Sequence, residues 1–230
     1  MTEPQCTGDG SLTLHSEAYG QTFHSLHGAA AEARHVYLEG SGVAAALADG
    51  KAVRVLEVGF GTGLNCWLAA DAAVRTGAQL ELVSLEKSLL TADTVRGLEF
   101  GHLLHEPALL DVWLEFRAGL PDVVPPGALR VGLAPGVSLQ VLVGEARQAS
   151  LPGPFDAVWH DAFSPEANPE LWDEAFLGQL WQSLRPGGVL VTYSVKGTVR
   201  RLLAGLGFEV VKLPGPPGGK REMLRAQTAA

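Results

Sequence analysis

The segment Val53–Asn65 constrains the fold of this chain most strongly. Its first part, residues 53–58, is rich in β-branched and apolar side chains and predicts a buried parallel strand. Three glycines then follow at alternate positions, Gly59, Gly61 and Gly63, and the residues after them favour a helix. A strand, a glycine turn and a helix in this order are typical of α/β proteins that bind nucleotides, because a Cβ atom in the turn would block the approach of the ligand.

Acidic residues on the first two predicted strands narrow the class of nucleotide. Glu57 lies two residues before the first glycine, where its charge disfavours a phosphate and favours a cationic or zwitterionic nucleotide such as S-adenosylmethionine. Residues 80–86 predict a second strand that ends in Glu86, and a carboxylate there is placed to accept both ribose hydroxyls. The residues predicted to bind S-adenosylmethionine on these grounds are Glu57, Gly59, Gly61, Gly63 and Glu86.

Two more acids follow later strands of the predicted sheet. Residues 129–133 and 137–143 predict a hairpin whose second arm is the third central strand, and Glu145 follows it, where it is placed to bond the adenine amino group. Residues 155–161 predict a fourth strand that ends in Asp161. Because ligands bind at the carboxyl ends of parallel strands, Asp161 is expected beside the glycine turn, with a helix cap or turn residue as the alternative.

Composition predicts a folded chain and excludes several classes. Apolar residues make up 47% and charged residues 18% of the 230 residues, no apolar run reaches the length of a membrane span, and no signal peptide is visible. Cys6 and Cys66 have no metal or redox spacing, which fits a reducing cytoplasm. His102 and His105 share a helical face without a third ligand, so no metal site is expected.

The N-terminal part differs from the rest of the chain. We expect residues 1–11 to be a disordered leader, residues 1–45 to form an extension that packs over the site, and residues 46–230 to form the Rossmann-like domain of a single globular unit. Tyr19 and Phe23 lie in a segment typical of loops over pockets, although packing on the core is an equal alternative for both.

Charge is unevenly distributed along the chain. The net charge is −8, but from residue 185 onward eight basic residues face two acidic ones, giving +6 there and therefore −14 for the remainder. A basic region on an acidic protein permits a local phosphate-binding face, and the alternative is a solvated rim. The candidate phosphate-binding residues are Arg200, Arg201, Lys220 and Arg221.

Six segments together resemble a known family. They are residues 19–25, 32–39, 58–65, 84–87, 161–172 and 219–224, and the most specific is the string Asp-x-Phe-x-Pro-x-x-Asn-Pro-x-x-Trp in residues 161–172. The chain resembles the methyltransferase half of the MnmC family of tRNA wobble-uridine modification enzymes, in the stand-alone form called MnmD. The resemblance implies a class I S-adenosylmethionine-dependent methyltransferase, with a Rossmann-like, mostly parallel, seven-stranded sheet whose last strand is antiparallel.

The resemblance also implies a reaction and a substrate. The family transfers a methyl group from S-adenosylmethionine to the aminomethyl nitrogen on carbon five of the tRNA wobble uridine, giving 5-methylaminomethyl-uridine or its 2-thio form. Asp161 then holds the amine or accepts its proton, and positioning is favoured because an ordinary Asp pKa lies far below that of an amine. Tyr19, Phe23 and Phe163 contact the substrate, with Phe163 stacked on the uracil. Basic residues contact the anticodon region of the tRNA.

The chain departs from the family pattern in two respects, and two alternative functions stay open. Bifunctional members of the family add a flavin oxidase domain that these 230 residues do not contain, so no flavin is expected, and Glu145 stands where the family commonly has Asp. One alternative is a methyltransferase or aminopropyltransferase that acts on a small amine or a protein. The other is an RNA-binding protein that retains the cofactor without turnover. The sequence makes no prediction of the oligomeric state.

Overall fold

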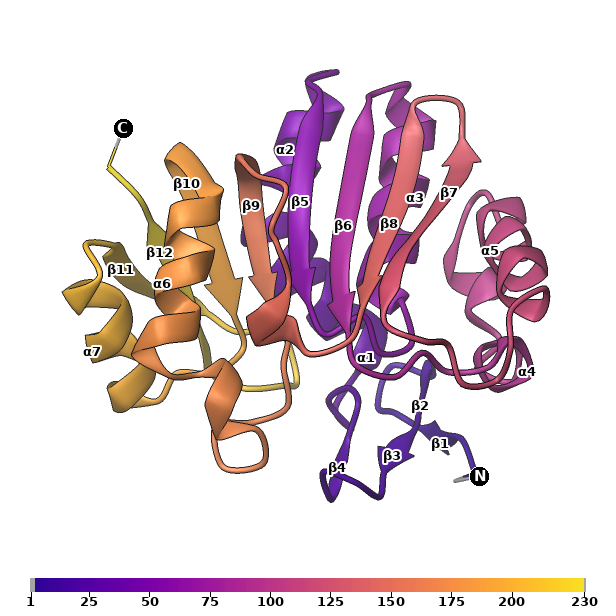
Figure 1. The fold of residues 1–230 in the computed structure, drawn as a ribbon, viewed down its shortest axis with the longest axis horizontal. Coiled ribbons are helices and arrows are strands. Elements are labelled where there is room, and N and C mark those ends of the chain that lie inside the picture. The colour runs from indigo at the N-terminus through magenta and orange to yellow at the C-terminus, as the bar shows by residue number, and fades with distance from the viewer. Residues whose placement is uncertain (1–2, 230) are drawn as a thin grey trace.

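A computed structural model describes residues 3–229 of the protein, and an eight-stranded sheet forms its centre (Figure 1). The strands of this sheet are β5 (Val53–Val58), β6 (Leu80–Glu86), β7 (Gly127–Ala134), β8 (Val137–Val143), β9 (Phe155–His160), β10 (Leu184–Thr192), β11 (Glu209–Pro214) and β12 (Glu222–Gln227). Their order across the sheet is β11-β12-β10-β9-β5-β6-β8-β7.

The pairing directions confirm the predicted fold class. Strand β5 lies between β6 and β9 and pairs in parallel with both, and in turn β6 pairs in parallel with β8 and β9 with β10. The last strand, β12, is antiparallel to both β10 and β11, as expected. The sheet has one strand more than the seven predicted, because the first arm of the expected hairpin, β7, pairs antiparallel with β8 and extends the edge.

Helices cover both faces of the sheet. They are α1 (Ala29–Glu32), continued by the π-helix η1 (Ala33–Glu39), α2 (Val43–Ala48), α3 (Leu64–Thr76), α4 (Ala92–Arg96), α5 (Ala108–Ala118), α6 (Glu174–Ser183) and α7 (Gly197–Gly205), with short 3-10 turns at Phe100–Leu103, Ala146–Gln148 and Pro169–Leu171. Alternation along β5 feeds two cores. Val53 and Val55 pack with α2, α3 and α5, whereas Leu56 and Val58 pack with α6 and α7.

The N-terminal residues form two small hairpins at the carboxyl ends of the parallel strands (Figure 1). These are β1 (Gln5–Cys6) with β2 (Leu12–Thr13) and β3 (His15–Ser16) with β4 (Gln21–Thr22). The prediction of a disordered leader is wrong for residues 3–11, since Asp9 accepts hydrogen bonds from Thr7 Oγ1 at 2.8 Å and from the Ala31 amide of α1 at 2.7 Å. Residues 1–2 of that predicted leader lie outside the described part of the chain.

No helix within residues 3–229 is long and apolar enough to cross a membrane.

Candidate active site

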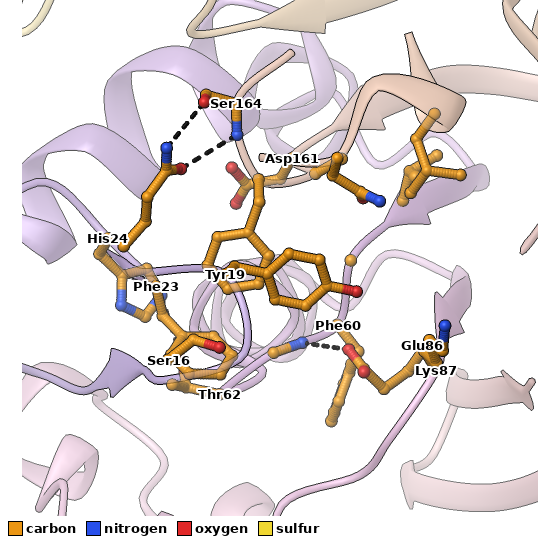
Figure 2. A pocket seen from close by; sticks show the side chains of 18 of the residues that line it. Ser16, Tyr19, Phe23, His24, Phe60, Thr62, Glu86, Lys87, Asp161 and Ser164 are labelled. Atoms are coloured by element: carbon orange, nitrogen blue, oxygen red, sulfur yellow. Dashed lines mark hydrogen bonds between the residues drawn. The ribbon is translucent and has the colours of Figure 1, made fainter. Parts of the chain in front are cut away.

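A cavity of about 1100 Å³ opens between the carboxyl ends of β5, β6 and β9 and the N-terminal hairpins. Its walls come from five parts of the chain: the segment 15–26, the glycine turn, the ends of β6 and β8, the loop after β9, and side chains near the C-terminus. Figure 2 shows the view into this cavity, with Tyr19 projecting between Asp161 and Glu86. One cavity therefore brings together predicted site residues from both ends of the chain and from three strands of the sheet.

The glycine turn forms the floor of the cavity, and each glycine is required for a different reason. Gly59, Gly61 and Gly63 all have positive φ angles, of 91°, 52° and 79°. A Cβ atom on Gly59 would lie 2.7 Å from the backbone oxygen of Asp161, and one on Gly61 would lie 2.9 Å from the Phe23 ring. Gly63 does not line the cavity, and a Cβ atom there would meet the Trp67 ring at 2.4 Å. The predicted contact of Gly63 with the cofactor therefore stays a prediction, and its position fits the start and packing of α3.

Glu86 lies at the carboxyl end of β6 and borders the cavity, as predicted. Its carboxylate accepts a hydrogen bond from the Gly61 amide at 2.9 Å (Figure 2) and another from the Ser88 amide at 2.8 Å. Burial raises the pKa of Glu86, while these backbone donors act in the opposite direction. The carboxylate is thus fixed to the same turn that approaches the ligand, with acceptor capacity left for a diol.

Glu57 is buried and is not among the residues that line the cavity, and its predicted contact with the cofactor stays a prediction. Its side chain is 1% exposed and accepts hydrogen bonds from Ser84 Oγ at 2.7 Å, Asn65 Nδ2 at 3.0 Å and Cys66 Sγ at 3.2 Å. Burial raises its pKa to about 7. The alternation of β5 explains the placement, because Glu57 points toward α3 and not past the end of the strand.

Asp161 lies at the end of β9 with its carboxylate in the cavity wall. Tyr37, on η1, donates its hydroxyl to Asp161 Oδ1 at 2.5 Å, and Asn65, at the start of α3, donates Nδ2 to Asp161 Oδ2 at 2.8 Å. Each carboxylate oxygen therefore accepts one bond and keeps capacity for another partner. Burial raises the pKa of Asp161 well above its ordinary value, and the Tyr37 and Asn65 bonds oppose that shift.

Asn65 connects the two acids at this end of the cavity. Its amide nitrogen donates to both Asp161 and Glu57, while its Oδ1 is buried without a partner among the described residues. This orientation of the amide follows from its neighbours, because only the nitrogen end offers donors to two carboxyl groups. Glu57 of β5, Asn65 of α3 and Asp161 after β9 therefore form one hydrogen-bonded cluster.

The N-terminal segment closes one side of the cavity through specific contacts. Gln21 exchanges two hydrogen bonds with Ser164, at 2.7 Å and 3.1 Å, and Tyr19 stacks on Phe163 at a centroid distance of 4.3 Å (Figure 2). Phe23 meets the Phe163 ring edge-on at 5.4 Å. The three aromatic residues predicted to contact substrate are thus brought together, and Tyr19 covers one face of Phe163.

The remaining predicted residues are divided between cavity and surface. Glu145 borders the cavity and forms an ion pair with Lys87 at 2.7 Å. All four candidate phosphate ligands are exposed; Lys220 also borders the cavity, whereas the other three lie outside its lining, namely Arg200, Arg201 and Arg221. The structure therefore does not place the four basic residues on one common face of the cavity.

The residues around the glycine turn fit S-adenosylmethionine. The glycine turn leaves room that Cβ atoms would fill, and Glu86 presents a fixed carboxylate beside it. Within residues 3–229, no group of three or more His, Cys, Asp and Glu side chains is arranged to hold a metal ion.

Comparisons with known proteins first define a class. A family described as S-adenosyl-L-methionine-dependent methyltransferase matches residues 116–229. The solved structure of MnmC2 from Aquifex aeolicus is similar to this chain with a TM-score of 0.75 and 32% identity, covering 98% of this chain and 70% of that one. The chain therefore belongs to the MnmC2 family of S-adenosyl-L-methionine-dependent methyltransferases.

Curated relatives agree with this family and are longer. The bifunctional protein MnmC of tRNA 5-methylaminomethyl-2-thiouridine biosynthesis from Pseudomonas aeruginosa is 37% identical over 219 residues, which are 91% of this chain and 32% of that protein. The protein of the same name from Aromatoleum aromaticum is 37% identical over 227 residues, 96% of this chain and 34% of its own length. The chain thus spans about a third of the length of these relatives.

Four residues at the Asp161 end were not predicted from the sequence. They are Glu32, Tyr37, Asn65 and Tyr193. Asn65 had a visible signal, since it is the polar residue in the otherwise apolar first turn of α3. The others come from η1, α1 and the end of β10, and no short spacing in the sequence connects them with Asp161.

Proposed function

We propose that this protein transfers a methyl group to the 5-aminomethyl nitrogen of the tRNA wobble uridine, giving 5-methylaminomethyl-uridine or its 2-thio form. The observation that carries the proposal is the buried Asp161 carboxylate, fixed by Tyr37 and Asn65 beside the glycine turn. A carboxylate is suited to an alkylammonium group, and the names of the curated relatives point to the same product.

The cofactor end of the cavity is assigned to S-adenosylmethionine. When bound, this cofactor supplies the methyl group. We assign Glu86 to the ribose hydroxyls, Gly59 and Gly61 to the close approach of the backbone, and Glu145 to the adenine end of the cavity. Glu57 acts only indirectly, because it fixes Asn65 and through it Asp161.

Asp161 is assigned two tasks at the other end. An alkylammonium nitrogen has no free lone pair, so one proton has to leave before the nitrogen can act as a nucleophile. The raised pKa of Asp161 narrows the difference from an amine, which supports proton transfer from the nitrogen to a carboxylate oxygen as well as positioning. Tyr37 and Asn65 hold the carboxylate in one orientation during this transfer.

The substrate base is assigned to the aromatic side of the cavity. Single-stranded bases of RNA stack on aromatic side chains, and Tyr19, Phe23 and Phe163 form such a cluster beside Asp161. The exposed Arg200, Arg201 and Arg221 are proposed to contact tRNA phosphates outside the cavity. The predicted cytoplasmic location stays a prediction.

Nucleoside mass spectrometry of tRNA tests this function. We expect a strain without the gene to accumulate 5-aminomethyl-uridine species, and the wild-type gene but not an Asp161→Asn gene to restore the methylated product. Normal 5-methylaminomethyl-uridine in the deletion strain would contradict the proposal. Turnover of a free amine by the purified protein at comparable efficiency, without RNA, would instead favour a small-amine enzyme.

A further inference from the structure

The cavity contains a cationic side chain that the assignments above leave without a role. Lys220, in the turn between β11 and β12, places its ammonium nitrogen 3.9 Å from the centroid of the Tyr193 ring. Both residues border the cavity near Asp161. Burial lowers the pKa of Lys220, while the charges of Glu32 and Asp161 act to raise it. Lys220 is exposed as a residue, yet its ammonium group lies over an aromatic ring at the border of the cavity.

Glu32 supplies a second carboxylate at this point. It lies at the end of α1, borders the same cavity and accepts a hydrogen bond from the Ser25 amide at 3.1 Å. Burial raises its pKa, and the nearby Lys220 opposes the shift. The Glu32 charge also raises the pKa values of Asp161 and Tyr193, so these groups belong to one electrostatic cluster.

The Tyr193 ring is held in place independently of the lysine. Its hydroxyl donates to the backbone oxygen of Ala162 at 2.9 Å, and its edge packs against Trp172 at 6.2 Å. The face that Lys220 occupies is therefore presented by a fixed ring. An aromatic face with carboxylates beside it is a recognition element for an alkylammonium group.

We propose that Glu32, Asp161 and Tyr193 form a subsite for the substrate ammonium group, and that Lys220 occupies this subsite in the free protein and leaves it when the substrate enters. The inference rests on the proposed function and deepens it, because it assigns the selection of aminomethylated over unmodified uridine to named residues. A neutral uracil gains no charge attraction from two carboxylates and an aromatic face. The aminomethyl group, when protonated, carries the same single positive charge as the lysine that it replaces.

The position of Lys220 in the chain agrees with such an exchange. It follows a segment rich in Pro and Gly, residues 214–219, and within residues 3–229 no carboxylate oxygen lies within 4.0 Å of its Nζ. Arg221 follows directly and is exposed, outside the lining of the cavity. Moving Lys220 outward would place its charge beside that of Arg221, where the substrate phosphates are proposed to lie.

Affinity measurements on two RNA probes test the subsite. The protein is loaded with S-adenosylhomocysteine and titrated with an anticodon stem-loop that carries either 5-aminomethyluridine or uridine at the wobble position. We expect wild-type protein to prefer the aminomethyl probe, and Glu32→Gln to lower this preference about 10-fold with unchanged affinity for the uridine probe. Glu32→Gln keeps the acceptor for the Ser25 amide, so the segment above it stays anchored.

Matched variants at the other two positions complete the test. Lys220→Met removes the competing cation and should raise the preference, whereas Lys220→Arg should leave it near the wild-type value. Tyr193→Leu should lower the preference, and Tyr193→Phe, which keeps the ring face, should not. Calorimetry with S-adenosylhomocysteine checks that each variant folds.

The outcomes separate the inference from the proposed function. Wild-type protein that binds both probes equally would overturn both. A wild-type preference that Glu32→Gln leaves unchanged, or equal weakening of both probes by this variant, would overturn the subsite alone. A lower preference in Lys220→Met would likewise overturn the exchange of cations.

Discussion

The two ends of the cavity are built differently. At the cofactor end, Glu86 is held by backbone amides of Gly61 and Ser88, so its geometry depends on the course of the chain. At the amine end, Asp161 is held by the side chains of Tyr37 and Asn65. Most side-chain substitutions leave the backbone donors to Glu86 in place. A single substitution of Tyr37 or Asn65 instead removes a donor to Asp161.

This difference assigns separate tasks to two buried carboxylates. Both have raised pKa values for the same main reason, burial, but their hydrogen-bond donors differ. Backbone donors fix Glu86 as an acceptor for a neutral diol. Side-chain donors leave Asp161 adjustable as a partner for a charged amine. The following predictions test this separation, beginning with the largest expected effect.

Replacement of Asp161 by Asn should affect catalysis most. The amide keeps the size of the side chain but loses the charge and the ability to accept the amine proton. We expect single-turnover methylation of aminomethyl-uridine tRNA to slow on the order of 10³-fold, with affinity for S-adenosylhomocysteine changed less than about threefold. Comparable losses in rate and cofactor affinity would show that the two ends are not separate.

Replacement of Glu86 by Ala should act on binding. The loss of two bonds from ribose hydroxyls to a charged acceptor should cost about 2–3 kcal/mol, or about 30- to 150-fold in cofactor affinity. Calorimetry measures this, and Glu86→Gln serves as the control that keeps an acceptor for the Gly61 amide. Unchanged affinity in the Ala variant would remove Glu86 from the cofactor site.

Glu57 should affect stability and its dependence on pH. Because its pKa is raised from 4.5 to about 7 in the folded protein, it favours folding below pH 4.5, and this contribution is lost as the pH rises through 7. We expect the unfolding free energy of Glu57→Gln to fall less than that of the wild type between pH 5 and pH 8, by about 2 kcal/mol. Urea denaturation at the two pH values measures the difference, and parallel curves would refute the assignment.

Replacement of Tyr37 by Phe should change the methylation rate least, but it should also shift the pH–rate profile in one direction. The ring still fills its buried place, but Asp161 loses a donor that lowers its pKa. We therefore expect an about 10-fold lower rate and an acid limb of the pH–rate profile displaced to higher pH. A lower rate with an unmoved profile would mean that Tyr37 only fills space.

The difference between backbone and side-chain donors also explains which site residues could be predicted from the sequence. The glycine turn and Glu86 belong to contiguous patterns whose chemistry is local, so their placement at the cavity followed from strand and turn periodicity. Asp161 was located because carboxyl ends of parallel strands share one edge. Tyr37 and Glu32 could not be located, because the path of the N-terminal segment across that edge depends on tertiary contacts such as Gln21 with Ser164.

Some predicted site residues do not line the cavity, because one sequence pattern permits two geometries. Glu57 and Gly63 belong to the nucleotide-binding motif, yet the strand alternation turns Glu57 toward α3 and the Trp67 ring takes the space beside Gly63. Lys220 and Arg221 are adjacent basic residues, but only Lys220 borders the cavity, with its ammonium group over the Tyr193 ring. Motif membership and adjacency do not fix the direction of a side chain.

The most direct test of two separate ends is a double-variant comparison. The specificity constant kcat/KM with aminomethyl-uridine tRNA, at cofactor concentrations below saturation, is measured for Glu86→Gln, Asp161→Asn and the two combined. Groups without shared partners act additively in free energy to within about 0.5 kcal/mol, so we predict a combined loss within about twofold of the product of the single losses. A double variant no worse than Asp161→Asn alone would contradict the separation.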